Sequence, residues 1–576
     1  MKIQPQPPAP STNRWHAFTS SRYFVYVLVA PLFLVLLAYV VYPFIQTFTD
    51  SISLKGQFSL KNYEKFFSLK NTANLEALWT SVYISVLSVI SCGIVGVAMA
   101  FLLERYEFPG RKILMVLALV PMALPPLIGV LSFTFLYGES GIIPRTLKLW
   151  LHMDHVPFSL KGIWGVVVVH TFTMYTYFYM TASAAIKGLD PSLEEAAANL
   201  GAGRLYVWRR VILPMLTPAL VASSLLVFMI SMASYTAPLI FGIERTMTMQ
   251  IYLSRTNGSL DMAAAQSTIL SIVSILFLLA MRWYQGLRNY QNMSKGVSVH
   301  RTEVKSPLGK YVAMVLSVIG VIVLLLPILV LVLISFSVDG TWTVQILPPK
   351  YTLSHYADLF MDSKTWRPIA NSFKMSAIAT VGNIIFGVAA AYAMVRMKFK
   401  GKFVLDLLIM LPWALPGTVV AVNLISAFSE RSVFSFDQVM IGTFWILPLA
   451  YFVRHLPLVF RSTSATLMQM DGSIEEAARN LGASWWYSFR RVVFPMALNG
   501  ILAGSLLAFV QGIGEFVSSI LLFTAKTTPI SVEIFQRMYA FEFGTACAYG
   551  VLQIALIIIV LFVSRKLTGD KAGSAI

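Results

Sequence analysis

The stretch Asp190-Pro-Ser-Leu-Glu-Glu-Ala-Ala-Ala-Asn-Leu-Gly-Ala202 occurs a second time as Asp471-Gly-Ser-Ile-Glu-Glu-Ala-Ala-Arg-Asn-Leu-Gly-Ala483. Between residues 190–215 and 471–496, 16 of 26 positions are identical. A second shared pattern lies upstream, where Pro121-Met-Ala-Leu-Pro125 matches Pro412-Trp-Ala-Leu-Pro416. The two patterns predict two homologous halves. They lie further apart in the first half than in the second, and we expect the extra residues in the loop 137–161.

The composition is that of a membrane protein. Hydrophobic residues make up 57% of the 576-residue chain and charged residues 12%, whereas soluble domains average about 45–50% and about 25%. A soluble fold has no surface for so much apolar side chain, and the mean hydropathy of +0.72 agrees with this interpretation. The composition therefore excludes a nucleic-acid-binding domain, a secreted protein and a disulfide scaffold.

Twelve apolar segments are long enough to cross a hydrocarbon core about 30 Å thick, which requires about 20 residues per helix. They form two sets of six: 23–48, 77–103, 113–136, 162–186, 214–240 and 264–284, then 311–337, 371–395, 403–428, 440–460, 496–522 and 546–564. We predict an all-α polytopic membrane protein with about 12 transmembrane helices in two homologous six-helix halves. Because both repeats have the same topological sense, their pseudo-two-fold axis should lie along the membrane normal, which is parallel symmetry.

The spans divide the chain into five parts. These are a cytoplasmic N-terminal tail (1–22), a first half (23–284), a cytoplasmic linker (285–310), a second half (311–564) and a C-terminal tail (565–576). The linker is polar and lacks apolar periodicity, which indicates a flexible joint. The first span is too long for the apolar core of a signal peptide, so we interpret it as a retained anchor.

The net charge of +18 indicates the orientation, because membrane proteins keep Lys and Arg on the cytoplasmic side. With a cytoplasmic N-terminus, the inner segments hold 27 of these residues and the outer loops hold 15. Lys374 and Arg454 lie inside spans or at their edges, and we favour a position of Arg454 in which its side chain reaches the cytoplasmic face. Both termini are therefore expected to be cytoplasmic.

The repeated stretches fall in cytoplasmic loops after the fourth span of each half, at 190–214 and 471–495. Asp190 and Asp471 can cap a helix, and the Glu pairs that follow favour the positive end of the helix dipole. Gly201 and Gly482 supply a C-terminal break where a positive φ is allowed. We interpret each helix–Gly–helix element as a docking site. The alternative is an amphipathic helix lying on the bilayer, which needs a broad apolar face that Glu-Glu-Ala-Ala lacks.

These residues resemble the EAA motif of binding-protein-dependent ABC importer permeases, which reads Glu-Ala-Ala, three residues, Gly, nine residues, Ile-x-Leu-Pro. The first copy matches at Glu195, Ala196, Ala197, Gly201, Leu213 and Pro214, with Val211 for Ile. The second copy matches at Glu476, Ala477, Ala478, Gly482 and Pro495, with Val492 for Ile and Phe494 for Leu. The resemblance covers nearly the whole chain, since each half looks like one type I importer permease. A fused double permease of this length is similar to the ferric-iron and 2-aminoethylphosphonate permeases.

In that family the loop is a coupling helix that sits in a cleft of an ATP-binding subunit. The resemblance implies polar contacts there from Glu195 and Glu476, and a bend set by Gly201 and Gly482. The whole coupling set is Glu194, Glu195, Ala196, Ala197, Gly201, Glu475, Glu476, Ala477, Ala478 and Gly482. Two loops on one chain imply two copies of an ABC ATPase subunit. An extracytoplasmic substrate-binding protein is the third partner, at the bacterial plasma (inner) membrane.

The chain carries no P-loop, because Gly309-Lys310 and Gly401-Lys402 are followed by aromatic residues where Ser or Thr is required. We therefore expect a permease subunit that is not an enzyme and binds no cofactor, with ATP and Mg in the partner subunits. His152 and His155 lie close together but have no evident third ligand, so no metal site is predicted. A membrane-embedded enzyme has no nucleophile–base pattern to support it.

The eleventh span carries Gln511, Glu515 and Ser519 at i, i+4 and i+8, which predicts one polar stripe on a helix. A carboxylate at that depth is costly against lipid, so the stripe should face protein or water. The first half has Ser234 at the matching position. We predict that these four residues line the translocation path, with Glu515 binding a cationic or metal-bearing substrate or holding a closed gate. The alternative is a structural carboxyl group satisfied between helices.

The expected function is import of a substrate by alternating access, coupled to ATPase subunits at the two EAA loops. Ferric iron is the favoured substrate because the fused two-half layout is similar to that of ferric permeases. The same machinery for 2-aminoethylphosphonate or another small organic anion is the alternative, and sugar phosphates, thiamine and polyamines remain open. A major-facilitator-type secondary transporter also has twelve spans in two halves, but repeated Glu-Ala-Ala loops have no role in it.

Overall fold

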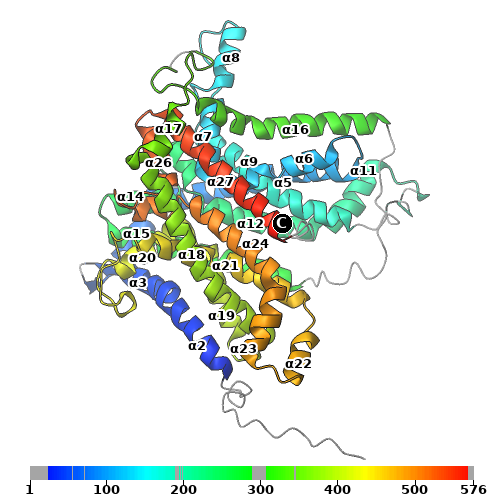
Figure 1. Cartoon of the computed structure of the whole chain (residues 1–576). Helices are drawn as coiled ribbons and strands as arrows, with labels where there is room; N and C mark the ends of the chain where they lie inside the picture. The colour runs from blue at the N-terminus through cyan, green and yellow to red at the C-terminus, as the bar shows by residue number, and fades with distance from the viewer. Residues whose placement is uncertain are drawn as a thin grey trace, which may run out of the picture.

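The computed structural model describes residues 24–568 except 55, 71, 189–193, 195, 198, 288–306, 343 and 344. The described part of the chain is built from helices (Figure 1), and its one sheet is a two-stranded antiparallel hairpin of β1 (Ser53–Leu54) and β2 (Gln57–Phe58). Most of the predicted linker 285–310 and both ends of the chain lie outside the described residues.

The first half begins with a continuous helical segment made of α2 (Phe24–Leu36), η1 (Leu37–Val41) and α3 (Tyr42–Ser51), followed by α4 (Lys61–Phe66). Its central helices are α5 (Ala73–Arg105), α6 (Arg111–Leu117), η2 (Val120–Ala123), α7 (Pro126–Tyr137), α8 (Ile142–Trp150) and α9 (Gly162–Lys187). After the first repeated stretch come α11 (Arg204–Val207), η3 (Trp208–Ile212), α12 (Leu213–Met232), α13 (Thr236–Ile240), α14 (Met247–Thr256) and α15 (Leu260–Leu287).

The second half repeats this order. It runs through α16 (Pro307–Ile334), α17 (Ser354–Met361), α18 (Ser363–Arg396), α19 (Lys402–Ala414), α20 (Gly417–Phe428), η5 (Val433–Ser435) and α21 (Ile446–Gln469). The second repeated stretch and the residues that follow it form α22 (Ser473–Asn480), α23 (Trp485–Ser488), η6 (Phe489–Val493), α24 (Phe494–Ile513), α25 (Ser519–Leu522), α26 (Ile530–Tyr539) and α27 (Phe543–Thr568).

Nine helices in the described ranges are long and apolar enough to cross a membrane, and the bent pair α19–α20 would make a tenth. Two more long helices, α9 and α21, stand at the predicted fourth spans of the two halves. Both carry polar groups inside their apolar sequence, among them His170 in α9 and Arg454-His455 in α21. The chain is thus an all-α polytopic membrane protein with two homologous halves, as its sequence predicts.

The third span of each half is not a straight helix. In the second half α19 and α20 meet at 110°, with Leu415 and Pro416 between them. In the first half Leu124 and Pro125, at the matching positions, separate η2 from α7. Proline removes a backbone donor and sterically disfavours helical geometry in the residue before it. The repeated Pro-x-Ala-Leu-Pro pattern therefore breaks both spans at the same place.

The first helix of each half packs on the other half. The α2–α3 segment contacts α18 and α20 of the second half, and α16 contacts α5, α6 and α7 of the first. Figure 1 shows both crossings: α2 and α3 run beside α18 and α19, and α16 lies along α5 and α6. Each half therefore completes its bundle with a helix from the other half.

Close helix packing inside each half uses a matched glycine. A Cβ at Gly96 of α5 would collide with Phe178 and the backbone of Tyr175 in α9. A Cβ at Gly387 of α18, the matching position of the second half, would press on Val459 in α21. Small residues let membrane helices approach closely enough for dispersion contacts, which replace the hydrophobic effect as the driving force in lipid.

The connection 138–161 of the first half holds an extra helix, α8, where the second half has only the short η5 between α20 and α21. Arg145 of α8 donates to the carbonyl of Gln345 at 2.9 Å and lies over the ring of Trp342, so α8 is tied to the second half. Figure 1 shows α8 projecting from the end of the molecule opposite α22.

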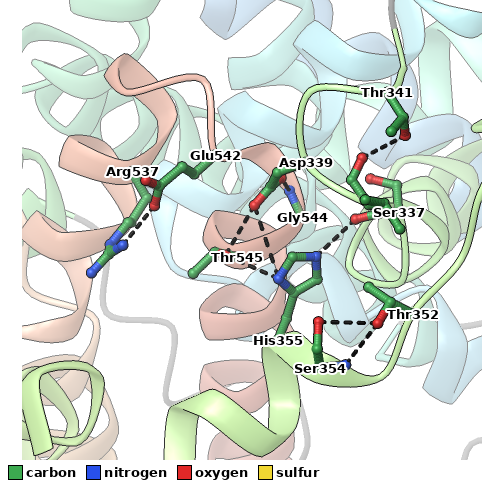
Figure 2. Close-up of polar contacts among 11 residues, drawn as sticks. Ser337, Asp339, Thr341, Thr352, Ser354, His355, Arg537, Glu542, Gly544 and Thr545 are labelled. Atoms are coloured by element: carbon green, nitrogen blue, oxygen red, sulfur yellow. Dashed lines mark hydrogen bonds and ion pairs between the residues drawn. The ribbon is translucent and has the colours of Figure 1, made fainter. Parts of the chain in front are cut away.

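A polar cluster fastens the segment between α16 and α17 to the start of α27 (Figure 2). Asp339 accepts from the backbone N–H of Gly544 at 2.6 Å and from the Thr545 hydroxyl at 3.0 Å. His355 bonds to the Ser337 carbonyl through Nε2 and to Thr545 through Nδ1. Asp339 thus satisfies donors at a helix N-terminus, where the backbone N–H groups lack intrahelical partners.

Candidate coupling loops and translocation path

The second repeated loop starts a helix as predicted. Asp471 accepts from the backbone N–H of Ser473 at 2.9 Å, at the first residue of α22. This hydrogen bond lowers the pKa of the Asp471 carboxyl below its ordinary value, because the N–H stabilises the ionised form. Glu475 and Glu476 lie in the first turn, where the helix dipole favours negative charge. In the first loop, Asp190 and Glu195 lie outside the described residues.

Both loops turn at their glycine with the same hydrogen bond. Gly201 has φ 82° and Gly482 has φ 88°, the left-handed region that glycine enters without penalty. The N–H of Ala202 donates to Ala197 at 3.0 Å, and that of Ala483 donates to Ala478 at 3.1 Å. This six-to-one bond is the Schellman closure of a helix end. The predicted C-terminal break is therefore present in both copies.

The first Glu of the pair in each loop is held by side chains of its own half. Glu194 is held by two hydrogen bonds from Arg105 at the end of α5, of 2.7 and 2.5 Å. Glu475 accepts from the Tyr392 hydroxyl of α18 at 2.7 Å, and Arg396 lies 3.9 Å away. Arg105 and Arg396 occupy matching positions of the repeat. The first Glu of each pair thus anchors the loop to its own half.

The exposed surface of each loop carries some of the motif residues and one leucine that the sequence reasoning missed. Glu476, Ala477 and Gly482 are exposed, as are Ala196 and Gly201 in the first loop. Leu200 and Leu481, which precede the glycines, are each 89% exposed. A single exposed apolar side chain is common on protein surfaces, but this leucine recurs at the same place in both loops. Its signal in the sequence is the Leu-Gly pair that both copies share.

The predicted polar stripe of the eleventh span is wrong in one respect: the span is not one helix. The helix α24 ends at Ile513 and α25 begins at Ser519, with Glu515 in the break. Gln511 is exposed, whereas Glu515 and Ser519 are buried, so the three do not share a face. The glycines at 512 and 514 weaken the helix here. The Glu515 carboxylate also accepts from the backbone N–H of Ser518, which favours the non-helical turn.

Glu515 is surrounded by donors. Its Oε1 accepts from the backbone N–H and the hydroxyl of Ser518, both at 3.0 Å. Its Oε2 lies 3.2 Å from Nε of Arg454 and 3.7 Å from Nε2 of His455, both on α21. Arg454 is therefore directed at Glu515 and, through Nη1, at Gly417 in the bend of the third span, and not at the cytoplasmic face as we favoured. Spacing within one span cannot reveal a partner on another helix.

The matching region of the first half is polar but uncharged. Ser234 is half-buried and lies 2.8 Å from Nε2 of His170 on α9. Nδ1 of His170 contacts the hydroxyls of Ser88 at 2.9 Å and Ser231 at 3.1 Å. His170 occupies the position that Tyr451 takes in α21, and Tyr451 bonds to Ser519 at 2.7 Å. Both halves therefore bury a polar cluster beside the break in their fifth span.

No group of three or more His, Cys, Asp or Glu side chains able to hold a metal ion occurs among the described residues. Glu515, which is buried, and Glu194, which is half-buried, each face an arginine. The site consequently offers two exposed loop surfaces and a buried, charge-balanced cluster between helices.

Two homologous bundles of apolar helices, each with a helix–Gly–helix element at one end, are the architecture of a membrane transport subunit. The family model described as "Binding-protein-dependent transport system inner membrane component" matches residues 93–288 and 383–568. The chain belongs to this family, the permease subunits of ABC importers, which function with ATPase and substrate-binding partners.

Similar proteins span most of the chain. A probable ABC transporter permease protein of Sinorhizobium fredii is 29% identical over 80% of this chain and 81% of its own. The ferric transport system permease protein FbpB of Actinobacillus pleuropneumoniae is 28% identical over 93% of this chain and 77% of its own. The molybdenum transport system permease protein ModB of Mycobacterium tuberculosis is 32% identical, but over 38% of this chain and 83% of its own.

Proposed function

We propose that this permease moves ferric iron. The support is the layout of its relatives: the ferric permease of Actinobacillus pleuropneumoniae aligns along both halves, over 93% of this chain. A protein of Haemophilus influenzae named as a putative ferric transport system permease aligns over 86% of this chain. The molybdenum permease aligns with only 38%, which is the length of a single half. Among the reported relatives whose names state a substrate, those that align along both halves are ferric permeases.

The coupling loops would each receive one copy of an ABC ATPase, giving two copies per chain. The set Glu194, Glu195, Ala196, Ala197, Gly201, Glu475, Glu476, Ala477, Ala478 and Gly482 would form the two surfaces, and we add Leu200 and Leu481 because they are exposed. Arg105 and Arg396 would hold Glu194 and Glu475 so that each loop moves with its half. ATP and Mg would then be bound by the ATPases. In this proposal the coupling loops and both termini lie on the cytoplasmic side.

Within the path, we propose that Glu515 holds a closed conformation and does not bind the substrate directly. Its carboxylate already has a guanidinium at 3.2 Å and two donors from Ser518, so its negative charge is balanced. A free cation would have to displace Arg454. Ser234 and Ser519 would lie beside the same region, and Gln511 is open on the surface of α24.

Reconstitution with the neighbouring ATPase and binding protein tests the substrate. Proteoliposomes are given either ferric iron or 2-aminoethylphosphonate together with the loaded binding protein, with and without ATP. We expect ATP-dependent accumulation of iron only. Accumulation of the phosphonate and not of iron would replace iron by the alternative substrate, while uptake without ATP that collapses with the proton gradient would contradict coupling to the ATPase.

A further inference from the structure

One pair of aromatic side chains joins the two halves at equivalent positions. Tyr235 follows Ser234 in the first half and Phe516 follows Glu515 in the second, so the two rings stand at matching positions of the repeat. Their ring centroids are 6.1 Å apart, with 30° between the ring planes. Each residue therefore contacts its own counterpart.

A contact between counterparts locates the pseudo-two-fold axis. In a two-fold arrangement a residue can meet its own symmetry mate only where both lie beside the axis, since elsewhere residue i meets a different residue j. The parallel repeat predicts that this axis runs along the membrane normal between the halves. The contact therefore puts Tyr235 and Phe516 on either side of the axis that relates the two halves.

The pair sits in matched breaks of the fifth spans. Tyr235 lies between α12 and α13, and Phe516 lies between α24 and α25. Gly514, in the second break, packs against Pro125 of the first half, so the two halves touch here at more than one point. Backbone outside a helix can change its φ and ψ angles without breaking an intrahelical hydrogen-bond ladder.

Two further rings extend the pair symmetrically. Tyr252 is the sixth residue of α14 and Phe535 the sixth residue of α26. The ring of Tyr252 is 5.3 Å from Tyr235, and that of Phe535 is 5.4 Å from Phe516. Four aromatic rings therefore form a continuous row across the two halves. Figure 1 places α14 and α26 at the end of the molecule away from α22.

The centre of the row is closed to solvent. Tyr235 is 0% and Phe516 is 2% exposed, and they belong to one apolar cluster with Leu127, Ile128 and Ile520, which come from both halves. Apolar constrictions block water and ions because a narrow dry passage cannot support a hydrated ion. The polar clusters around Glu515 and His170 lie directly beside this dry centre.

We propose that Tyr235 and Phe516 form the constriction that closes the translocation path at the side away from the coupling loops. Opening the path requires the two rings to separate, and the helix breaks that carry them are the hinges for this movement. The Glu515–Arg454 pair acts next to Phe516 as a positioning contact that holds the second-half break to α21. The assignment is independent of the substrate, so it does not rest on iron.

The test is the passive ion permeability of liposomes that contain the full permease with its ATPase but no nucleotide and no substrate. The double variant Tyr235→Ala/Phe516→Ala should raise the leak of trapped chloride at least tenfold. The single variants Tyr235→Phe and Phe516→Tyr should leak no faster than the parent. The matched control is Phe133→Ala/Phe172→Ala, which removes an equally buried pair 4.8 Å apart inside the first half. A leak equal to that of this control would overturn the proposal.

A second measurement tests the movement of the two positions by cross-linking, and not by the leak that follows removal of the aromatic rings. The variant Tyr235→Cys/Phe516→Cys is treated with a short reducible bifunctional thiol reagent in the assembled complex. Linked complexes should lose ATP-driven uptake and regain it after reduction, and the parent, whose Cys92 and Cys547 are buried, should be unaffected. Undiminished uptake by complexes shown to be linked would also overturn the proposal.

Discussion

Glu515 shows how a single ionised residue is tolerated inside a membrane bundle. A carboxylate in the hydrocarbon region is expensive unless protein groups replace its water. Here Ser518 supplies two donors from the same turn, and Arg454 and His455 approach from α21. The guanidinium fits only because Gly417, at the bend of the third span, has no side chain in its way. Three separate spans therefore meet at one carboxylate.

Removing one charge of the Arg454–Glu515 pair should destabilise the protein more than removing both charges. Arg454→Met leaves Glu515 buried without its countercharge, and breaking a buried pair in this way costs about 3–5 kcal/mol. The double variant Arg454→Met/Glu515→Leu removes both charges and should unfold at a higher temperature than Arg454→Met alone. The measurement is the thermal unfolding midpoint in detergent. Single and double variants with equal midpoints would contradict the expected penalty for burying Glu515 without Arg454.

Glu515→Gln separates stability from transport. Gln keeps the size of the side chain and can still accept from Ser518, but it no longer attracts Arg454. We expect assembly with the ATPase to be unchanged and the substrate transported per ATP to fall, because the second-half break is held less firmly. Uptake equal to that of the parent would leave only a structural role for the carboxyl group.

At the scale of the element, the coupling loops combine an anchored side and an open side. The anchored side is Glu194 with Arg105 and Glu475 with Arg396 and Tyr392. The open side presents Leu200 and Leu481. In the second loop Glu475 turns to the anchored side and Glu476 is exposed, because neighbouring residues on a helix point about 100° apart.

Replacing Gly201 or Gly482 by Val should uncouple the permease. A side chain at positive φ costs about 1–2 kcal/mol, and the loop relieves this strain by changing its turn. ATPase association should weaken while the protein still inserts. Gly258 is the matched control, since it also has a positive φ, 78°, with open space around it. Equal ATPase binding by Gly482→Val and Gly258→Val would contradict a special role of the coupling turn.

Leu200→Asn and Leu481→Asn should reduce ATPase affinity with no loss of stability, because the side chains contact almost nothing in the permease itself. Loss of a buried apolar anchor at an interface commonly costs about 1–2 kcal/mol, which is roughly a tenfold change in affinity. Leu69→Asn serves as the control, since Leu69 is 85% exposed in a loop before α5. Titration of the purified ATPase against each variant gives the dissociation constants to compare.

At the scale of the whole molecule, the exchange of first helices makes the halves interdependent. Contacts of α3 with α20 and of α16 with α7 hold them together without the linker. A protease site inserted within 288–306 and then cut should therefore leave a complex that elutes and unfolds like the intact chain. Separation of the fragments by size-exclusion chromatography in detergent would show that the covalent linker is needed.

The sequence by itself determined the class, the two halves and both coupling turns. Hydrophobic content and span length depend only on composition, and a repeat shows itself by comparison of the chain with itself. The turn at Gly482 is equally local, because a capping Asp471, a Glu pair and the glycine all act within one short stretch. The broken third spans follow in the same way from their prolines.

Only the tertiary structure decided what lies between the helices. The Arg454–Glu515 pair joins two different spans, and Tyr235 meets Phe516 across the two halves. Periodicity gives the face of one helix but not the neighbour that this face meets. Apolar spans look alike from their sequence, so the crossing of α2–α3 and α16 leaves no local signal. The polar stripe failed for the same reason, because Glu515 takes partners from Ser518 and α21 that favour a break over a continuous helix.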